Sequence, residues 1–432
     1  MNVPITDLYR LKPGAIWKAF ASENFAFWMS CAYLFFEYVR PQAIWSGFDV
    51  YPYWARTFVL LAFLGWLLDK KSQFVWTNIS KGVFGYLFLV ILSSSLAYWP
   101  EISWSNFMVY FNWVVVFFVL TQTTTTRKRF FILLLIFVVA SFKLSQHGAR
   151  TWTMRGFSFT SWGLMGPRGF FQNSGELAIQ MVIFAPIAYF FALGIKPYLK
   201  RWQTTLLYLM PITAAMTVLG ASSRGAQLAL VVQIFALIIM MKNKIRMLIL
   251  ISIMIFIGFQ IIPEKQKIRF DTIGSDETSM QRILYFKNGI EMIKEHPIIG
   301  VGYFNFAPYY TIHHSDDLLN REKSEVPHNI FIQVGTDTGI FGLSVYIILI
   351  GGSWRIVGKI GKEAERIGDV FVSNLAKGMN LGLLGYVIAG QFVTVAYYPY
   401  FWIHLVFVTA MGTFWSIDKK GLCQLHLIDS RD

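Results

Sequence analysis

One histidine and several arginines stand at the ends of long apolar runs, where polar chemistry meets a membrane surface. His328 follows Pro327 and comes just before an apolar run that resumes at Ile330. Because proline favours a helix start, the sequence predicts that His328 lies in the first helical turn. There the helix dipole disfavours an imidazolium, which leaves a neutral imidazole that can serve as a base. The alternative is a histidine that only caps the helix end.

Two arginines occupy positions where local structure does not favour a cation. Arg224 lies in a short turn, 222–225, between two apolar runs, and Gly225 beside it permits close approach of a partner. Arg282 begins a predicted helix, where a cation opposes the helix dipole. The position of Arg224 indicates a guanidinium that binds phosphate through paired hydrogen bonds, and that of Arg282 indicates a contact with a ligand. For Arg224, the alternative is a charged head that snorkels to the surface from a helix end.

A further basic segment, 143–173, contains no acidic residue. Its arginines, Arg150, Arg155 and Arg168, are candidates for binding an anionic donor or acceptor. Asn173 closes the segment and could cap the helix that follows. The alternative is a basic patch that binds the phosphates of lipid headgroups or lipopolysaccharide.

Asp337 is an ionisable residue inside an apolar run, and such residues are usually functional. Gly335, Gly339 and Gly342 surround it and allow close helix approach. The alternative is an aspartate that pairs with a neighbouring helix.

The sequence lacks the usual signatures of metal and nucleotide sites. The outer segments contain no Asp-x-Asp or paired-carboxylate motif of the sort that holds a metal on a nucleotide sugar or lipid phosphate. The sequence also has no zinc-spaced Cys/His cluster, phosphate-binding glycine loop or nucleophile elbow. We therefore expect neither a metal nor a cofactor. An arginine-rich site suits a diphosphate leaving group that guanidinium groups neutralise.

The composition indicates which elements position these residues. The chain is 55% hydrophobic and 14% charged, whereas soluble domains carry about 25% charged residues. We therefore expect a single all-helical integral membrane domain over residues 1–432. The sequence predicts about twelve membrane-spanning runs, near 24–38, 56–68, 82–99, 107–123, 130–142, 174–195, 203–220, 225–241, 247–262, 329–352, 376–396 and 400–417.

Charge placement predicts the orientation of these runs. With the N-terminus in the cytoplasm, the cytoplasmic segments hold 23 of the 38 basic residues but 9 of the 24 acidic ones, so they carry the whole net charge of +14. Both termini are then cytoplasmic, and segments 143–173 and 263–327 lie on the opposite side. Topology explains the high pI, so no nucleic-acid partner is expected. No signal-peptide cleavage site follows the first apolar run, so we expect that run to be retained as a helix. Cys31 lies within a predicted span and Cys423 near the C-terminus, and we expect no disulfide bond between them.

The long polar segment 263–327 is expected to contain amphipathic helices. Thr278 and Gln281 have the spacing of a capping box. Four apolar residues then repeat at helical spacing, and His296-Pro297 should end the helix. The stripe consists of Ile283, Phe286, Ile290 and Ile293. This helix either covers a cavity or packs on the tops of other helices.

Several of these motifs, in this order, resemble one superfamily. They are Arg224 in Ser-Ser-Arg-Gly-Ala, Arg282 before an apolar helix, Gly-Val-Gly-Tyr-Phe at 300–304, and Pro327-His328-Asn329. The chain resembles the O-antigen ligase and O-antigen polymerase superfamily of bacterial membrane glycosyltransferases, most closely over residues 165–350. The resemblance implies a glycosyltransferase type C fold in the inner membrane and metal-independent transfer, in the periplasm, of a glycan linked to undecaprenyl diphosphate.

The resemblance also implies roles for individual residues. His328 would activate the acceptor hydroxyl, and Arg224 and Arg282 would bind the diphosphate. Arg168 and Asn173 fall in a stretch similar to another family motif. For ligases, the acceptor is a sugar of the lipid A–core. We expect an inverting O-antigen ligase whose partners are this donor, this acceptor and membrane lipids.

Other functions remain open at this point. A polymerase of the same superfamily uses the same donor chemistry. The segment Tyr-Val-Arg-Pro-Gln at 38–42 is similar to the protein O-glycosylation or exopolysaccharide ligase branch. A polysaccharide or lipid transporter is the alternative from another class, although the chain shows no related halves.

Overall fold

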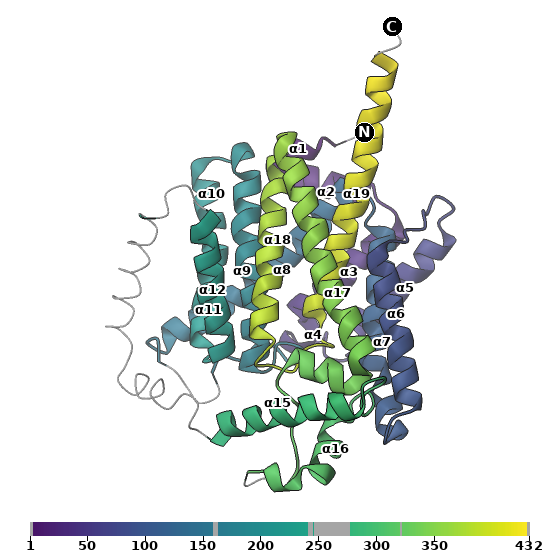
Figure 1. Cartoon of the computed structure of the whole chain (residues 1–432). Coiled ribbons are helices and arrows are strands. Elements are labelled where there is room, and N and C mark those ends of the chain that lie inside the picture. The colour runs from purple at the N-terminus through teal and green to yellow at the C-terminus, as the bar shows by residue number, and fades with distance from the viewer. Residues whose placement is uncertain (1–2, 159–162, 241–244, 246–276, 320–321, 430–432) are drawn as a thin grey trace.

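The chain folds into a bundle of helices in this computed structural model (Figure 1). The structure describes residues 3–158, 163–240, 245, 277–319 and 322–429, with side chains up to residue 419, and it contains no strand within these ranges. The N- and C-termini lie at one end of the bundle, and α15 and α16 lie at the other. We call the latter the α15 end.

The helices follow one another along the chain with short connections. The first are α1 (Ile5–Tyr9), α2 (Pro13–Ala21), α3 (Phe25–Val39), α4 (Pro41–Ile44), α5 (Trp54–Leu68), α6 (Asn78–Ser95), α7 (Pro100–Thr123), α8 (Arg127–Met154) and α9 (Ser174–Ile195). They continue with η1 (Lys196–Tyr198), α10 (Arg201–Leu207), α11 (Leu209–Gly220), α12 (Arg224–Met240), α15 (Glu277–Glu295), α16 (Phe306–His313), η2 (Ser315–Asp317), α17 (Ile330–Arg366), α18 (Val370–Ala389) and α19 (Pro399–Asp429).

The helical class predicted from the sequence is confirmed. Eleven of the twelve predicted apolar runs overlap these helices, and the run 247–262 lies outside the described residues. Seven helices of the described part are long and apolar enough to cross a membrane, so the chain is a multi-pass membrane protein. The number twelve stays a prediction. The seven are α6, α7, α8, α9 with η1, α10 with α11, α17 and α19.

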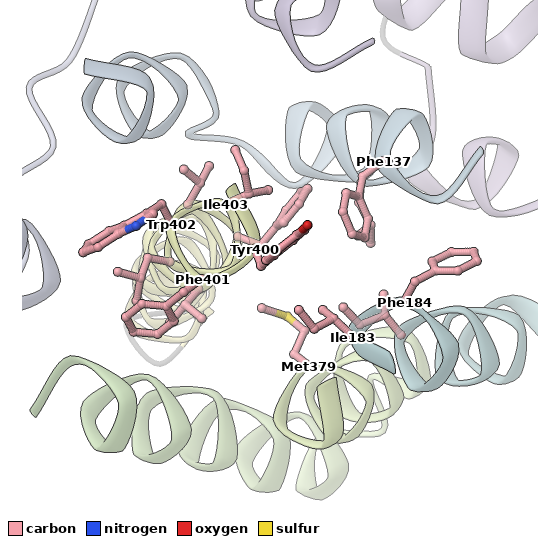
Figure 2. Packing of buried hydrophobic residues seen from close by; sticks show 14 of the residues in the cluster. Phe137, Ile183, Phe184, Met379, Tyr400, Phe401, Trp402 and Ile403 are labelled. Carbon is pink, nitrogen blue, oxygen red and sulfur yellow. The ribbon is translucent and has the colours of Figure 1, made fainter. Parts of the chain in front are cut away.

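Glycines on α18 let this helix pack closely against α9, which is buried along most of its length. A Cβ added at Gly378 would lie 2.9 Å from the carbonyl oxygen of Pro186, and one at Gly382 would lie 2.9 Å from that of Ile183. Small residues four apart allow such backbone contact between membrane helices. Side chains of α8, α9, α18 and α19 complete this core (Figure 2), in which Ile183, Met379 and Tyr400 meet.

A glutamine stabilises the break in hydrogen bonding that Pro186 makes in α9. Proline has no N–H, so the carbonyl of Val182 loses its helical donor. The side-chain amide of Gln233, on α12, donates to the Val182 oxygen at 2.9 Å and to the Leu381 oxygen at 2.8 Å. This one buried amide therefore connects α9, α12 and α18.

Ion pairs fasten the bundle at the end that carries the termini. Arg127, the first residue of α8, pairs with Asp369 between α17 and α18 and with Asp418 on α19. Arg129 pairs with Glu23, which follows α2. The segments that the charge count assigns to one side of a membrane therefore meet at one end of the structure.

A break within α17 connects this helix to the segment after α15. Gly339 has φ 67° and ψ −168°, which interrupts the helix. The N–H of Ile340 donates to the Pro297 oxygen, and the Thr336 oxygen accepts from Val301, both at 2.8 Å. In an unbroken helix, Ile340 would donate to Thr336. Residues 297–301 thus replace the hydrogen bond that the break removes.

The predicted capping box at the start of α15 is wrong. The helix begins at Glu277, so Thr278 lies inside it. The amide of Gln281 donates to the Asp317 oxygen at 2.9 Å and accepts from the Leu319 N–H at 2.8 Å. The buried side chain of Gln281 therefore holds the segment after α16 through two backbone hydrogen bonds. Sequence spacing predicts local caps, and it does not indicate partners that are this distant along the chain.

The apolar stripe predicted for α15 is not the face by which this helix packs against the rest of the protein. Ile283 is 58% exposed and Phe286 is 47% exposed, whereas Tyr285 and Met292 are fully buried. The helix does end at Glu295, before His296-Pro297, as predicted. The buried cluster beneath α15 consists of Tyr285, Met292, Val301, Phe306, Tyr309, Tyr310 and Ile332.

The break in α17 predicts a clear difference between two glycine-to-alanine variants. Gly339→Ala should lower the melting temperature of the detergent-solubilised protein, because its backbone conformation is almost restricted to glycine. The new Cβ would also lie 2.5 Å from the Ile298 carbonyl. We expect destabilisation of at least about 1–3 kcal/mol.

Gly351→Ala, in the same helix, is the matched control, because its added Cβ would meet no atom within 4 Å. It should leave the melting temperature unchanged or raise it slightly. Equal melting temperatures for the two variants would contradict the role assigned to Gly339.

Candidate functional site

His328 lies at the α15 end, one residue before the N-cap of α17. Asn329 caps the helix: its side-chain oxygen accepts from the N–H groups of Phe331 at 2.8 Å and Ile332 at 3.2 Å. The prediction that His328 lies within the first turn is therefore wrong, because Asn329 is the better capping residue. His328 instead has a left-handed backbone, φ 52°, and its N–H donates to Thr394 Oγ1 at 2.7 Å.

The imidazole of His328 contacts a carboxylate that the sequence did not single out. His328 Nε2 lies 3.3 Å from Glu325 Oε2, and the imidazole-bearing side chain is 22% exposed. The N–H of Glu325 donates to the hydroxyl of Tyr285, on α15, at 2.9 Å. The histidine and its carboxylate are thus attached to both α17 and α15.

The turn between α18 and α19, residues 390–398, supports the start of α17. The N–H of Ile330 donates to the Gly390 oxygen at 2.9 Å, and Asn329 Nδ2 donates to Gln391 Oε1 at 3.0 Å. The side-chain oxygen of Gln333 accepts from the N–H of Ala396 at 3.1 Å. Together with Thr394, these bonds fix the backbone around His328 to one turn, which we call the 390–398 turn.

Arg224 lies on another side of the same turn. It is the exposed first residue of α12, so the predicted turn ends two residues earlier than expected. A Cβ added at Gly225 would lie 2.6 Å from Cβ of Phe392, so only glycine fits there. The close approach predicted for Gly225 is therefore observed, and its partner belongs to the turn that holds His328.

Arg282 is exposed on α15, three residues before Tyr285. One helical turn therefore separates Arg282 from the tyrosine whose hydroxyl binds the backbone of Glu325. The structure thus gathers Arg224, Arg282 and His328 at the α15 end through Phe392, Thr394 and the Tyr285–Glu325 hydrogen bond.

The basic segment reaches the same region, although residues 159–162 lie outside the described residues. Arg155 NH1 donates to the Gly163 oxygen at 3.3 Å. A Cβ at Gly163 would lie 2.2 Å from the oxygen of Ala221, three residues before Arg224. Arg168 is exposed in the turn that follows, and Arg150 is exposed near the end of α8.

Asn173 forms the N-cap of α9 beside a buried acid that the sequence analysis missed. The Glu176 carboxylate accepts from the N–H of Asn173 at 3.1 Å, from its Nδ2 at 3.0 Å and from the Tyr398 hydroxyl at 2.8 Å. Burial and the nearby carboxylate raise the pKa of Tyr398, so its hydroxyl remains a donor. The basic segment is thereby attached to the 390–398 turn.

Asp337 lies deeper, next to the break in α17. Its side chain is 2% exposed, and Oδ1 accepts from the N–H of Phe304 at 3.1 Å. The backbone oxygen of Asp337 accepts from the hydroxyl of Ser93 on α6. In this structure Asp337 therefore contacts the 297–305 segment rather than the exposed surface.

Several of the exposed charges near the 390–398 turn are arginines. Four exposed arginines lie on the segments that are connected to the 390–398 turn, and Glu325 and Glu176 are the acids that contact His328 and Asn173. The part of the chain that the structure describes has no group of three His, Cys, Asp or Glu arranged to hold a metal ion. Such a surface can bind an anionic group and present an imidazole beside it. The arginines are Arg155, Arg168, Arg224 and Arg282.

The fold is that of a multi-pass membrane protein, and His328 and several exposed arginines form a candidate site at one end of its helices. Residues 209–347 match the family model described as O-antigen ligase. The match extends from α11 into α17 and contains Arg224, Arg282 and His328. The predicted resemblance to the O-antigen ligase superfamily is confirmed by this segment. A search of curated proteins gives no match.

The cap of α17 predicts different stabilities for two substitutions of Asn329. Asn329→Ala removes the acceptor for Phe331 and Ile332 and should cost about 0.5–2 kcal/mol of stability. Asn329→Asp also loses the Nδ2 donor to Gln391, but it keeps the acceptor oxygen for these two N–H groups and adds a charge that the helix dipole favours, so it should lose less stability than the alanine variant. Thermal unfolding in detergent measures both, and an alanine variant as stable as the aspartate variant would contradict this cap.

Proposed function

We propose that this protein is an O-antigen ligase that transfers a glycan from undecaprenyl diphosphate to the lipid A–core oligosaccharide. One observation carries the proposal: within the segment that matches the O-antigen ligase model, the 390–398 turn contacts both His328, through Thr394, and Gly225, the residue next to Arg224, through Phe392. The proposed location is the bacterial inner membrane. The termini would face the cytoplasm and the α15 end the periplasm, as the charge distribution predicts.

In the proposed reaction, a hydroxyl of the acceptor sugar attacks the anomeric carbon of the donor. The new glycosidic bond forms as the bond to the diphosphate oxygen breaks, and attack from the opposite face inverts the configuration. His328 accepts the hydroxyl proton, and the electron pair of the broken bond leaves on the diphosphate. General-base help of this kind contributes about 10²–10⁴-fold to the rate.

The guanidinium groups of Arg224 and Arg282 are proposed to bind the diphosphate. Negative charge grows on the leaving group as the bond breaks, and positioned cations stabilise it more in the transition state than in the ground state. This role supports transfer without a metal ion. Arg150, Arg155, Arg168 and Asn173 would bind further polar groups of the donor or acceptor.

Glu325 is proposed to position the imidazole. If Nε2 of His328 donates to the Glu325 carboxylate, Nδ1 is the basic nitrogen of the ring. The carboxylate also stabilises the imidazolium that forms after proton transfer. Asp337 would act indirectly, by holding Phe304 and the segment beside the break in α17.

His328→Ala should lower glycan transfer by about 10²–10⁴-fold, because the acceptor hydroxyl loses its base. The assay contains purified protein, a glycan linked to a polyprenyl diphosphate, the lipid A–core acceptor and a chelator. We expect transfer by the unaltered protein to persist with the chelator.

His313→Ala is the matched control, because His313 is exposed on α16 at the same end of the bundle. It should retain transfer. Full activity of a well-folded His328→Ala variant would remove the base assignment. In cells, loss of a ligase leaves long polymer on the carrier lipid, whereas single repeats would indicate a polymerase.

Arg224→Ala should lower transfer by about 10–100-fold, since hydrogen bonds to charged groups contribute about 1.5–3 kcal/mol each. Arg224→Lys should recover part of the rate, because lysine keeps the charge but not the paired donors. Arg355→Ala, an exposed arginine on the other half of α17, should have no effect. A normal rate for Arg224→Ala would exclude Arg224 from diphosphate binding.

A further inference from the structure

Arg40 is a partly buried cation whose side chain makes no hydrogen bond with the described residues. It lies between α3 and α4, and its side chain is 18% exposed. Its Nε is buried without a hydrogen-bond partner. Its one ion pair among these residues is with Glu37, at 3.8 Å between NH1 and Oε1, and that oxygen also lacks a hydrogen bond.

Without a bound ligand, the surroundings of Arg40 reduce the stability of the folded protein. A guanidinium has five donors, and donors removed from water without acceptors reduce stability. The backbone of Arg40 is also left-handed, φ 54°, which is unfavourable for residues other than glycine. The fold thus maintains both a strained backbone and a guanidinium whose buried Nε has no acceptor at this position. Strain and unsatisfied polar groups of this kind are concentrated at binding sites.

The guanidinium lies against the turn that carries Arg168. A Cβ added at Gly169 would be 2.2 Å from NH1, 2.3 Å from Cζ and 2.6 Å from NH2 of Arg40, so only glycine permits this contact. The next residue, Phe170, packs against Tyr398 with ring centroids 5.2 Å apart. Arg40 is therefore connected to the candidate site through one short turn and the 390–398 turn.

The surroundings of Arg40 favour an anion. Lys143 donates to the Val39 oxygen at 3.4 Å, so a second cation lies beside the backbone of Arg40. Arg168 adjoins Gly169. Among the residues described here, Glu37 is the acid that pairs with Arg40, and its contact is too long for a hydrogen bond.

We propose that Arg40 is a further anion-binding residue of this site, whose guanidinium binds a phosphate group of a substrate through paired hydrogen bonds. The inference rests on the proposed function, since it assigns Arg40 to the same reaction. The phosphate belongs either to the diphosphate of the lipid-linked donor or to the acceptor lipid. In the segment Tyr-Val-Arg-Pro, residues 38–41, the arginine is thereby assigned a binding role that the sequence alone does not indicate.

Steady-state kinetics of four variants test this proposal. Arg40→Gln should raise the KM of the substrate that carries the phosphate by about 10–100-fold, with a smaller effect on kcat, since a hydrogen bond to a charged group contributes about 1.5–3 kcal/mol. Arg40→Lys should lie between this variant and the unaltered protein. Arg56→Gln is the control, an exposed arginine at the start of α5, and it should leave both KM values unchanged.

A double variant separates substrate binding from neutralisation of Glu37. Arg40→Gln leaves a buried carboxylate unpaired, and Glu37→Gln removes that charge. The double variant Glu37→Gln/Arg40→Gln has no unpaired buried carboxylate to destabilise its fold, but its KM should remain raised. Recovery of the normal KM would show that Arg40 only neutralises Glu37 and would overturn the proposal.

The two substrates are varied separately, so a raised donor KM identifies the diphosphate and a raised acceptor KM identifies the acceptor lipid. Unchanged values for both in a folded Arg40→Gln or double variant also overturn the proposal. Neither outcome affects the proposed function, which is tested by glycan transfer to the lipid A–core acceptor with the unaltered protein and by the glycans that accumulate in cells when the protein is lost.

Discussion

The structure depends on the satisfaction of backbone hydrogen bonds inside an apolar helix bundle. In a membrane, no water can replace a lost partner, so an interrupted helix needs another protein group. The break at Gly339 would leave the Thr336 oxygen and the Ile340 N–H without partners, and residues 297–301 supply both. The segment before α17 is therefore part of that helix's hydrogen bonding. A loop joined in this way gives a defined position to the residues that follow it.

The same principle explains why the 390–398 turn is central to the site. Helix ends leave backbone groups without intrahelical partners. At the start of α17, Gly390 and Thr394 satisfy the N–H groups of Ile330 and His328. Phe392 packs against Gly225, and the Tyr398 hydroxyl donates to Glu176. One short turn thus contacts the starts of three helices, which are distant in sequence and carry the polar groups of the site.

Some of this architecture could be predicted from the sequence because its causes are local. Apolar runs predict helices, and polar residues at their ends predict where chemistry is possible, so His328 and Arg224 could be singled out. Partners chosen by packing could not be predicted. Gln281 has capping-box spacing, yet it bonds to residues 36 and 38 positions away. Glu325 and Thr394 have no local signal, since only the folded chain brings them to His328.

The dependence of His328 on the 390–398 turn has a consequence for biogenesis. Translation produces Arg224, Arg282 and His328 before the turn, and the acceptor for the His328 N–H lies 66 residues downstream. A nascent chain that has reached only α17 holds all three side chains but not the backbone support that orders them. α18 and the start of α19 must therefore be inserted before the site can assemble. The ribosome thus completes the site near the end of synthesis, when most of the bundle is already in the bilayer.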